Sequence, residues 1–522
     1  MEDTVRYTDQ QLSVIRSVSK KIKVRAYAGT GKSSTLVGYA KARPTLRMLY
    51  LAYNAAIRAE AKKKFGPNVD CHTGHSLAFS KAAPYVESRG GKGLGNIKNI
   101  EVARAMMVAP SIARMSLIAL SNFFNNADTE ITIAHVKNAV DTKSEPSVET
   151  INIIFDLTKD LWRKIQDPKD LAFKMPHDGY LKLFHLANPD LSKYKVILFD
   201  EAQDANPVIT DIVKSQKHMG TVVVGDRHQS IYRFRGAEDS LDKFDSEETF
   251  VLSKSFRFGY GIGKLASLLL NTFKEETVPV EGLSRDKRTG NLNSTEFVVD
   301  KDKPYAYLCR TNAMLLDIAV GLVAQNKTLH FIGGPTAYRF DLIMDAFNLW
   351  SDKRDLIRDP AMRYFPCWTD LTLFAAESND PEYKILIKVI DKYTNEIPAL
   401  IEKAKQSHQE DQESAQVVLC TGHRAKGLEF DQVVLADDFA DLMVPPSDDG
   451  IDEQEINLLY VATTRAERCI ELPLSMQEWL LSIGEPIQKI IIDQAALIAK
   501  DNKQRDCMDD RTSDSPDRRS AA

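Results

Sequence analysis

The chain has 522 residues, 43% of them hydrophobic and 27% charged, and its formal net charge is −5. This composition is typical of an ordinary soluble globular protein with room for three or four domains. It excludes a protein that attracts nucleic acid through a general excess of positive charge. Any nucleic-acid site should therefore be a local groove in which stacking supplies part of the affinity.

The cysteines and the N-terminus bear on where the protein resides. Six cysteines are scattered along the chain without a CxxC pair, which is typical of reduced, buried thiols. Cys71, His72 and His75 could suggest zinc ligands, but no second ligand pair follows at zinc spacing. The chain shows no signal peptide and no apolar run of about 20 residues. We expect an intracellular protein, cytoplasmic or nucleoid-associated with a nuclear location left open, and no membrane partner.

Short apolar, β-rich runs alternate with helical patterns in two blocks. Continuous apolar runs with intervening helices predict parallel sheets covered on both faces, and two such blocks predict two α/β domains in tandem. The expected strands are 23–26, 48–52, 196–199, 221–224 and 249–252 in the first block, and 305–308, 330–332, 417–420 and 433–436 in the second.

Each block is interrupted by a mainly helical insertion, at about 86–178 in the first and about 336–414 in the second. A glycine cluster at 90–95 follows no expected strand, so it predicts a surface loop rather than a nucleotide fingerprint. The last segment, 501–522, has almost no apolar content and predicts a disordered tail.

A glycine-containing loop, AYAGTGKS at 26–33, follows the first expected strand and opens a helix that should end before Pro44. Its backbone N–H groups would wrap a β-phosphate at the helix N-terminus. Lys32 would reach the β- and γ-phosphates, and Ser33 would ligate Mg²⁺. Ala26 replaces the first glycine of the strict P-loop pattern, and GK[ST] alone arises by chance in about one chain in four. The strand–loop–helix setting and a distant acidic pair support the interpretation.

That acidic pair, Asp200 and Glu201, ends the apolar run 196–199. Carboxylates at the carboxyl end of a parallel strand can hold a metal ion and orient a water molecule against a phosphate. Asp200 should hold Mg²⁺ through water, and Glu201 should act as the base on the attacking water. The alternative is an acidic turn that caps the next helix.

The run 221–224 ends in Gly-Asp and is followed by a glutamine, an aromatic residue and two arginines. One strand over from the carboxylates, Gln229 and Arg235 could sense the same phosphate and report to Phe234, which could face a base. These patterns together indicate an ATP-driven motor on nucleic acid.

Residues 7–472 resemble a superfamily 1 helicase of the UvrD/Rep/PcrA type, and the resemblance is specific because many motifs occur in the family's order. YTDQQ at 7–11 resembles the Q-motif, and 26–33 resembles motif I, whose AxxGxGK[ST] form accommodates Ala26. Motifs II to VI are matched by DEAQD at 200–204, GDRHQSIYRFRGA at 225–237, SKSFRFG at 253–259, CTGHRAKGLEF at 420–430 and YVATTRAE at 460–467.

The resemblance implies two tandem RecA-like parallel-sheet domains. Domain 1A would comprise 1–85 and 179–260, insertion 1B 86–178, domain 2A 261–335 and 415–500, and insertion 2B 336–414. ATP would then lie between the two blocks, so that closure and hydrolysis are coupled.

The implied cofactors are ATP and Mg²⁺. Gln11 would read the adenine with Phe256 nearby, and Glu429 would meet the ribose. Gln229 and Arg257 would contact the γ-phosphate, with Arg465 as an arginine finger that contributes about 10³–10⁵ in rate. For Arg465 the alternative is a surface ion pair with a carboxylate such as Glu467.

In full, the implied catalytic residues are Lys32, Glu201, Gln229, Arg257 and Arg465, and the Mg²⁺ ligands are Ser33 and Asp200. The implied nucleotide contacts are Gln11, Ala26, Tyr27, Ala28, Gly29, Thr30, Gly31, Lys32, Ser33, Ser34, Phe256 and Glu429.

The resemblance also implies contacts to DNA. Tyr53 and Phe234 occupy positions where relatives carry base-stacking aromatics, although either could instead belong to the core. His75 and His423 match positions in motifs Ib and V that approach the strand, with a structural role as the alternative for each. Gly74 replaces the family's usual aromatic in motif Ib. Stacking on such side chains contributes about 1–3 kcal/mol per base.

Within the family, the likeness is closest to the F-box DNA helicases, on HDGYLKLFHL at 177–186 and SFRFG at 255–259. The motor begins almost at residue 1, so we expect no F-box and transfer no ubiquitin-ligase role.

We therefore expect an ATP-dependent helicase or translocase on single-stranded DNA, with 3′-to-5′ polarity implied by the resemblance alone. Its expected partners are single-stranded DNA, junctions of single- and double-stranded DNA, and replication or recombination proteins. The alternatives are a translocase that strips bound proteins with little unwinding, and a nucleotide-switched DNA-binding module. Preference for DNA over RNA, and the choice among repair, replication and recombination, stay open.

Overall fold

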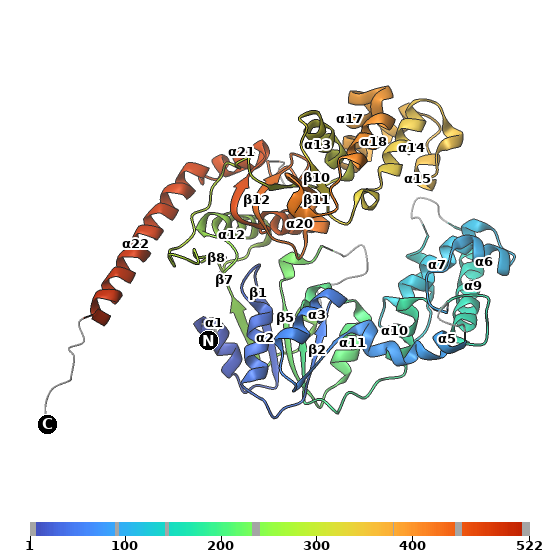
Figure 1. Ribbon diagram of the computed structural model, residues 1–522. Helices are drawn as coiled ribbons and strands as arrows, with labels where there is room; N and C mark the ends of the chain where they lie inside the picture. Colours follow the sequence, from blue (N-terminus) through green and yellow to red (C-terminus); the bar gives the residue numbers. More distant parts are fainter. Residues whose placement is uncertain are drawn as a thin grey trace. The chain divides into compact units, whose positions relative to one another are not determined.

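The computed structural model describes residues 7–88, 93–140, 146–231, 241–378, 381–443 and 451–513. The chain divides into two units, residues 1–27 with 31–252 and residues 28–30 with 253–522, whose elements are labelled in Figure 1. The first α/β domain therefore ends at 252, earlier than the expected 260. The reason is local: the segment after it, β7 (Lys254–Ser255), pairs with β8 (Glu281–Gly282) of the second unit.

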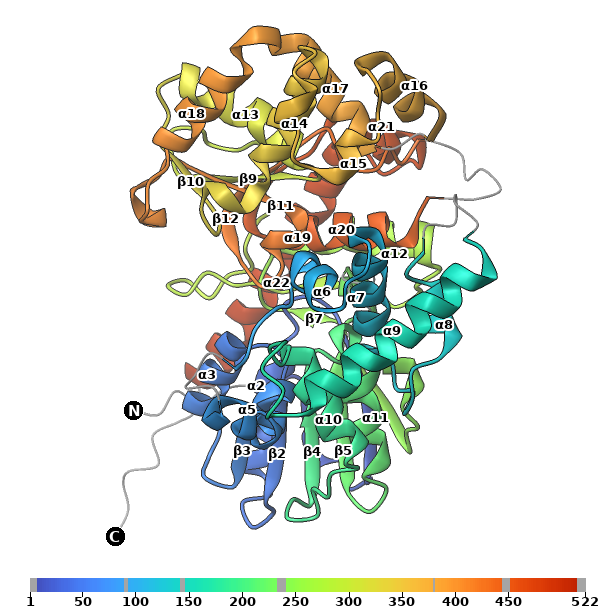
Figure 2. The ribbon, with the colours of Figure 1, turned by 90° about the vertical axis from the view of Figure 1, so that its right-hand side faces the viewer.

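The first unit contains a six-stranded sheet in the order β3-β2-β4-β5-β1-β6, and every pairing is parallel. Figure 2 shows β3, β2, β4 and β5 side by side. The strands are β1 (Lys21–Ala26), β2 (Met48–Ala52), β3 (Val69–Thr73), β4 (Val196–Phe199), β5 (Gly220–Gly225) and β6 (Glu248–Leu252). The predicted parallel sheet is confirmed, but β3 was not expected, because Asp70 and His72 interrupt its apolar pattern.

Eleven described helices belong to this unit. Capping residues mark the N-termini of several of these helices. Thr8 and Gln11 form a reciprocal cap at α1, and Asn206 caps α11, where Pro207 takes the first helical position. They are α1 (Asp9–Arg16), α2 (Lys32–Lys41), α3 (Ala55–Lys64), α4 (Gly74–Leu77), α5 (Ala83–Ser88), α6 (Asn99–Ala105), α7 (Pro110–Phe124), α8 (Ile133–Lys137), α9 (Val148–Gln166), α10 (His177–Leu186) and α11 (Pro207–Ser215).

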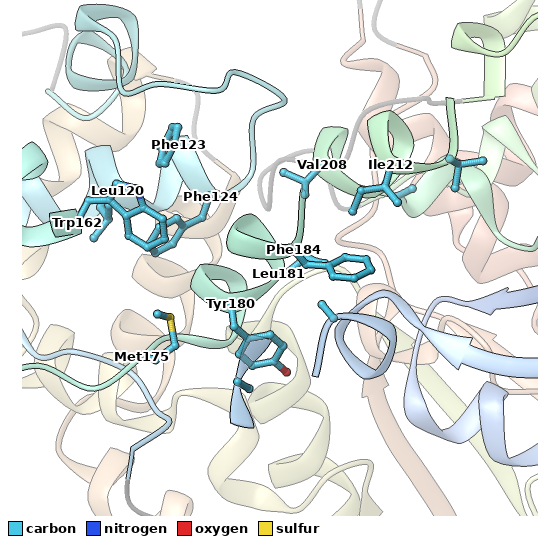
Figure 3. Close-up of a cluster of buried hydrophobic side chains, with 14 of the residues drawn as sticks. Leu120, Phe123, Phe124, Trp162, Met175, Tyr180, Leu181, Phe184, Val208 and Ile212 are labelled. Atoms are coloured by element: carbon cyan, nitrogen blue, oxygen red, sulfur yellow. The ribbon is translucent and has the colours of Figure 1, made fainter. Parts of the chain in front are cut away.

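The first helical insertion shares a hydrophobic core with the sheet. One cluster joins Phe124 of α7 and Trp162 of α9, whose rings lie 5.0 Å apart, to Leu181 of α10 and Val208 of α11 (Figure 3). Ile197 of β4 belongs to the same cluster. Because the burial is continuous, the insertion is packed onto the sheet rather than linked to it by a separate core. Of the glycine cluster at 90–95, residues 90–92 lie outside the described residues.

A buried lysine of α10, Lys182, connects this helix to the first insertion through hydrogen bonds. Lys182 has no exposed surface, and its ammonium donates hydrogen bonds to the carbonyls of Asn126 (2.6 Å) and Asp128 (2.5 Å) in the loop after α7. The Nζ atom also lies 4.3 Å from the centroid of the Phe123 ring. Burial lowers the pKa of Lys182 to about 8, although the charges of Asp128 and Asp211 oppose the shift.

The second unit contains a five-stranded sheet in the order β10-β11-β9-β12-β13, again with only parallel pairings. Its strands are β9 (Tyr305–Cys309), β10 (Leu329–Phe331), β11 (Val417–Thr421), β12 (Phe430–Leu435) and β13 (Ala466–Glu471). Strand β13 was not expected, because Glu467 and Arg468 interrupt its apolar pattern.

The second insertion is also helical and also shares its core with a sheet. Phe347 of α14 and Ile390 of α17 belong to one cluster with Val417 and Leu419 of β11. The helices of this unit are α12 (Tyr260–Lys274), α13 (Asn312–Ala324), α14 (Phe340–Trp350), α15 (Pro360–Arg363), α16 (Trp368–Ser378), α17 (Pro381–Tyr393), α18 (Ile397–Gln406), α19 (Gly422–Ala425), α20 (Glu453–Thr463), α21 (Leu474–Ser482) and α22 (Ile487–Ser513).

The predicted disordered tail is wrong for residues 501–513, which continue α22. No glycine or proline interrupts the sequence of this helix, and Asp501 holds Arg285 through two hydrogen bonds of 2.7 Å. Residues 514–522 lie outside the described residues. Within the described ranges, no single helix has the length and apolar character of a membrane span, although the bent pair α6 and α7 together meets that test by length and composition.

The buried Lys182 predicts a pH dependence of stability. Its pKa is about 8 in the folded chain and about 10.4 in an unfolded chain. The unfolded chain therefore binds more protons between these values, and folding stability should rise with pH from about pH 8 to about pH 10. Thermal melting across this window should show a shallower rise for Lys182→Met than for the wild type. Lys159→Met, at an exposed position of α9, serves as the control; equal slopes for wild type and Lys182→Met would contradict the assignment.

Candidate nucleotide-binding and catalytic site

The glycine-containing loop joins β1 to α2, as the sequence predicts. Gly31, at φ +77°, caps the first turn of α2 in the left-handed region, where a side chain would be strained. A Cβ atom at Gly31 would also lie 2.6 Å from Nε2 of Gln11, so the loop and this Q-motif glutamine are in close contact. The Oε1 atom of Gln11 accepts a hydrogen bond from the Thr8 N–H (2.9 Å). The structure thus places Gln11 beside the candidate phosphate loop.

The tip of the loop, residues 28–30, groups with the second unit. Within that unit the Ala28 N–H donates to the Tyr460 hydroxyl (3.0 Å), and the Phe256 N–H donates to the Gly29 carbonyl (2.9 Å). A Cβ atom at Gly29 would lie 2.4 Å from the Ser255 hydroxyl, so this position also requires glycine.

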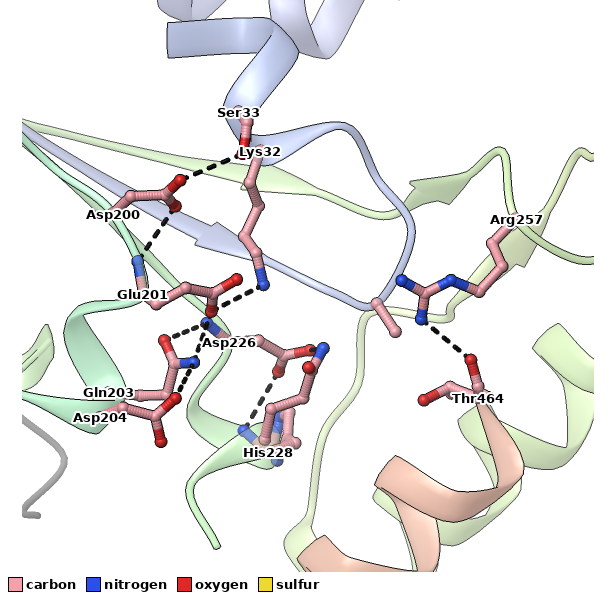
Figure 4. A network of polar contacts seen from close by, with 12 residues as sticks. Lys32, Ser33, Asp200, Glu201, Gln203, Asp204, Asp226, His228, Arg257 and Thr464 are labelled. Atoms are coloured by element: carbon pink, nitrogen blue, oxygen red, sulfur yellow. Dashed lines mark hydrogen bonds and ion pairs between the residues drawn. The ribbon is translucent and has the colours of Figure 1, made fainter. Parts of the chain in front are cut away.

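Four of the predicted phosphate-site residues converge at the carboxyl end of β4 (Figure 4). Lys32 Nζ lies 3.2 Å from Glu201 Oε2, and the Ser33 hydroxyl donates to Asp200 Oδ2 (3.1 Å). Asp200 Oδ2 also accepts a hydrogen bond from the Tyr50 hydroxyl (2.7 Å). Sequence reasoning missed Tyr50, whose only signal was a hydroxyl-bearing residue inside the apolar run of β2.

The electrostatics of this group are dominated by buried negative charge. Burial, and then the neighbouring charge of Glu201, raise the pKa of Asp200, while Lys32 and two hydrogen bonds lower it in part. Burial alone would lower the pKa of Lys32, but the nearby carboxylates, Glu201 foremost, outweigh it and raise that pKa. Lys32 therefore remains an ammonium ion and balances part of the carboxylate charge.

The donor set fits a magnesium ion. Ser33 and Asp200 offer hard oxygen ligands within hydrogen-bond distance of each other, which is the chemistry that Mg²⁺ prefers. A divalent cation would also relieve the unfavourable burial of the Asp200 carboxylate. Ser33 and Asp200 would hold the ion, and it would supply charge neutralisation for a phosphate group.

A chain of hydrogen bonds leads from Glu201 to the next strand end (Figure 4). Gln203, fully buried, donates from Nε2 to Glu201 Oε2 (2.6 Å) and accepts at Oε1 from the Asp226 N–H (3.0 Å). Gln229 in turn donates to Asp226 Oδ2 (2.7 Å). A Cβ atom at Gly225 would lie 2.6 Å from Gln203 Oε1, so the close packing depends on that glycine. The predicted base and the predicted phosphate sensor are thereby connected.

Glu201 itself has a left-handed backbone, with φ +51° and ψ +44°. Such a conformation is uncommon for a residue with a long side chain and is tolerated where the surroundings enforce it. Here the Glu201 side chain is held by both Lys32 and Gln203. The alternative interpretation of this motif, a simple acidic helix cap, does not account for these contacts.

In the second unit, Arg257 and Glu429 contact each other. Arg257 donates from Nε to Glu429 Oε1 (2.7 Å) and from Nη1 to the Thr464 carbonyl (2.9 Å), the latter drawn in Figure 4. The expected roles of Arg257 at the γ-phosphate and of Glu429 at the ribose require this pair to separate.

Arg465 is buried, with 1% of its surface exposed, so its interpretation as a surface ion pair is wrong. Its guanidinium donates to the carbonyls of Val461 (2.9 Å) and Leu428 (3.2 Å) and to the Thr464 hydroxyl (3.3 Å). The Arg465 side chain therefore connects motif VI to the end of motif V through hydrogen bonds within its own unit.

Two of the four predicted DNA contacts line one cavity of the first unit. Tyr53, after β2, is 41% exposed, which makes its interpretation as a core residue wrong. His75, in α4, pairs with Asp178 of α10 (3.0 Å). Tyr53, His75 and Asp178 line a cavity of about 550 Å³ beside the end of β4.

The remaining positions predicted to contact DNA lie outside this cavity or outside the described residues, apart from Gly74 on the cavity wall. A Cβ atom at Gly74 would lie 2.7 Å from Cδ1 of Ile209 in α11, so a larger residue at this position would require the Ile209 side chain to move. His423 lies half-buried in α19 of the second unit. Phe234 and Arg235 lie outside the described residues.

Loss of the Gln203 side chain should slow nucleotide hydrolysis without preventing nucleotide binding. Misplacement of a catalytic group by about 1 Å can cost about 10² in rate, so Gln203→Ala should lower kcat by roughly tenfold to a hundredfold. Steady-state phosphate release with varied ATP measures this. Gln216→Ala is the matched control, since Gln216 is a buried glutamine that bonds Leu191 and Pro189 instead. An unchanged kcat for Gln203→Ala would contradict a positioning role.

Comparison with known proteins agrees with this geometry. Residues 96–247 match the UvrD/REP helicase N-terminal domain, and residues 376–476 match the UvrD-like helicase C-terminal domain. The chain is 31% identical to F-box DNA helicase 1 of Gallus gallus over 527 residues, covering 93% of this chain and 51% of that protein. It is 30% identical to F-box DNA helicase protein 1 of Schizosaccharomyces pombe over 491 residues, covering 86% and 55%. DNA helicase IV of Escherichia coli is 23% identical over 329 residues, covering 57% and 37%.

The chain spans about half the length of the two F-box DNA helicases it matches. The N-terminal match falls in the first unit and the C-terminal match in the second, so each parallel sheet lies in the unit that carries one of the two helicase domains. On these matches and this architecture, the chain belongs to the family of UvrD-like helicases.

Proposed function

We propose that the chain hydrolyses ATP, with Mg²⁺, to move along single-stranded DNA in the 3′-to-5′ direction, separating strands or displacing bound proteins. The observation that carries the proposal is the convergence of Lys32, Ser33, Asp200 and Glu201 at the carboxyl end of a parallel sheet. A lysine, a hydroxyl and two carboxylates in this arrangement supply phosphate binding, metal ligation and a general base.

In the proposed reaction, the Lys32 ammonium leaves its ion pair with Glu201 and binds the phosphates of the nucleotide. Glu201 Oε2, which now faces Lys32 and Gln203, then becomes available to accept a proton from the attacking water. Gln203 keeps the carboxylate in place during this exchange, and Gln229 senses the γ-phosphate from its position on Asp226. The bound Mg²⁺ would neutralise phosphate charge.

The second unit would contribute two guanidinium groups. Arg257 would leave Glu429 for the γ-phosphate, which frees Glu429 to meet the ribose. The Arg465 guanidinium would leave its backbone carbonyl partners and contact the negative charge that develops on the phosphate in the transition state. Because hydrolysis then requires groups from both units, each turnover is coupled to a change between them, and that change drives stepping along the strand.

The support for DNA as the track comes from the relatives, two of which are named F-box DNA helicases. Tyr53 and His75, both at one cavity of the first unit, offer a stacking face and a hydrogen-bonding group for a strand. The proposed partners are single-stranded DNA, its junctions with duplex, and proteins of replication, recombination or repair, in an intracellular setting.

A translocase that strips proteins with little unwinding is the second candidate. It is favoured by the small size of the second insertion, about 336–414, which leaves little additional protein to engage duplex DNA. Strand separation and streptavidin displacement, measured on matched DNA substrates, would distinguish the two. A nucleotide-switched binding module, in contrast, would bind DNA with negligible ATP turnover.

Substitution of the proposed base gives the direct test of hydrolysis. Glu201→Gln should lower DNA-stimulated phosphate release by about 10²–10⁴, because general-base catalysis is lost while the phosphate contacts remain. Binding of a fluorescent ATP analogue should persist. Glu60→Gln, at an exposed position of α3, is the control. Unchanged phosphate release by Glu201→Gln would show that the base is misassigned.

The choice of activator tests the proposed track. The ATPase rate should rise strongly with single-stranded DNA and much less with blunt duplex, because the stacking face of Tyr53 reaches only unpaired bases. RNA serves as the third activator in the same assay. Equal stimulation by blunt duplex and by single strands would contradict a motor on single-stranded DNA.

A further inference from the structure

Tyr50 of β2 bonds a carboxylate on which the phosphate chemistry depends. Its hydroxyl donates to Asp200 Oδ2 (2.7 Å), and neither residue has more than 2% of its surface exposed. The Tyr50 ring packs against Phe65, with the ring centroids 4.9 Å apart. The proposed reaction gives this tyrosine no part, although a group that hydrogen-bonds a metal ligand also tunes how that ligand binds its metal ion.

Strand β2 fixes both the backbone and the side chain of Asp200. Strands β2 and β4 pair in parallel, with Tyr50 opposite Leu198. The Asp200 N–H donates to the Leu51 carbonyl (3.2 Å), while the Tyr50 hydroxyl bonds the carboxylate. The orientation of the Asp200 carboxylate is therefore set by the neighbouring strand as well as by the phosphate loop.

The hydrogen bonds fill the two oxygens of the Asp200 carboxylate unequally. Oδ2 accepts from two hydroxyls, those of Tyr50 (2.7 Å) and Ser33 (3.1 Å). Oδ1 accepts the Glu201 N–H (3.0 Å) and no other donor among the described residues; Figure 4 draws the bonds from Ser33 and Glu201. A carboxylate offers about four acceptor sites, two on each oxygen. Both sites of Oδ2 are therefore filled, and one site of Oδ1 remains for a metal ion or for its water.

This difference between the oxygens distinguishes divalent cations. Ca²⁺ accepts carboxylates that bind through both oxygens, whereas Mg²⁺ is smaller and keeps several of its waters. Binding through both oxygens of Asp200 would require a hydroxyl to leave Oδ2. The Tyr50 hydroxyl would then be buried without a partner among the described residues, which is unfavourable.

We propose that Tyr50 is a positioning residue that makes the site selective for Mg²⁺ over Ca²⁺, because it keeps Oδ2 of Asp200 occupied and leaves Oδ1 to face the metal ion. The inference rests on the proposed function, since it assumes that the site takes a nucleotide together with a divalent cation. It adds a metal-selecting residue that lies outside motifs I and II, which supply the phosphate and metal contacts.

Nucleotide binding, rather than turnover, tests this selectivity. The fluorescent nucleotide mant-ADP is bound to the full chain while Mg²⁺ is titrated in one series and Ca²⁺ in another. Tyr50→Phe removes the hydroxyl and keeps the ring that packs on Phe65. The Mg²⁺ concentration for half-maximal binding should rise about tenfold, as is typical when a metal ligand loses a hydrogen-bond partner. The Ca²⁺ concentration should change less, so that the preference for Mg²⁺ falls by about fivefold or more.

Tyr194→Phe is the matched control. Tyr194 is also fully buried, and its hydroxyl donates to another carboxylate of the same unit, Asp70 Oδ2 (2.9 Å). Because Asp70 begins β3 and Asp200 follows the end of β4, this bond lies at the other end of the sheet. Tyr194→Phe should keep the Mg²⁺ and Ca²⁺ dependences of the wild type.

A metal-free measurement separates positioning from a purely structural role. In EDTA, Tyr50→Phe should bind mant-ADP as tightly as the wild type does, because Lys32 and the phosphate loop are unchanged. An equal loss of affinity with EDTA and with Mg²⁺ would overturn the inference. So would a Tyr50→Phe chain without a thermal unfolding transition, since the hydroxyl would then serve the fold itself.

A double substitution tests whether Tyr50 acts through Asp200. In an Asp200→Asn background, Tyr50→Phe should cause no further change in metal preference, because the carboxylate that the hydroxyl holds is already absent. A full additional effect of Tyr50→Phe in that background would overturn the proposed route.

Failure of this inference differs from failure of the proposed function. If the wild type binds mant-ADP without any dependence on Mg²⁺, the proposed function fails. If the wild type depends on Mg²⁺ and Tyr50→Phe shows the same Mg²⁺ and Ca²⁺ dependences, Tyr50 does not select the metal ion and this inference is overturned while the motor stands.

Discussion

The arrangement of the first unit depends on the neutralisation of buried negative charge at the end of β4. Asp200, Glu201 and Asp226 gather around a single ammonium group, that of Lys32, and burial makes each unpaired charge costly. Lys32 forms an ion pair with Glu201 at 3.2 Å. A nucleotide with its metal ion would bring a new cation to Asp200 and new anions to Lys32. The site is thus built so that binding exchanges one set of ion pairs for another.

The same principle describes the second unit. The two arginines expected at the phosphate are held by partners of their own unit, Arg257 by Glu429 and the Thr464 carbonyl, and Arg465 by the carbonyls of Val461 and Leu428. Each guanidinium is therefore already hydrogen-bonded within its own unit, and it would have to leave these partners to contact a phosphate. Breaking these hydrogen bonds would cost free energy, and this cost would offset part of the free energy gained when the arginines bind phosphate. The exchange of partners would therefore remain reversible.

Much of the fold was readable from the sequence because the strands of parallel sheets are continuous apolar runs. The runs at β2 and β4 were predicted to the residue, and the loop before α2 was recognised from its glycines and lysine. Strands β3 and β13 were not predicted, because polar residues such as Asp70 and Arg468 interrupt their apolar pattern. Each forms by pairing with a neighbouring strand, β3 with β2 and β13 with β12, rather than through a strand pattern of its own. Low apolar content predicts disorder past residue 500, but no glycine or proline interrupts the sequence there and the helix α22 continues to Ser513.

The candidate site was predictable where chemistry is encoded by adjacent residues and not where it arises from tertiary contact. Lys32, Asp200 and Glu201 carry recognisable motifs. Tyr50 does not, since a tyrosine within an apolar strand gives no sign that it will bond Asp200. Likewise, the pairing of Arg257 with Glu429 joins residues far apart in the sequence. The shared core between each insertion and its sheet also depends on packing that no local pattern specifies.

The most direct test of this account is an experimental structure with a non-hydrolysable ATP analogue and Mg²⁺. The account predicts that Lys32 Nζ moves from Glu201 to a phosphate oxygen, that the metal ion lies between Ser33 and Asp200, and that Arg257 releases Glu429. A nucleotide bound with the pairs Lys32–Glu201 and Arg257–Glu429 both intact would contradict it.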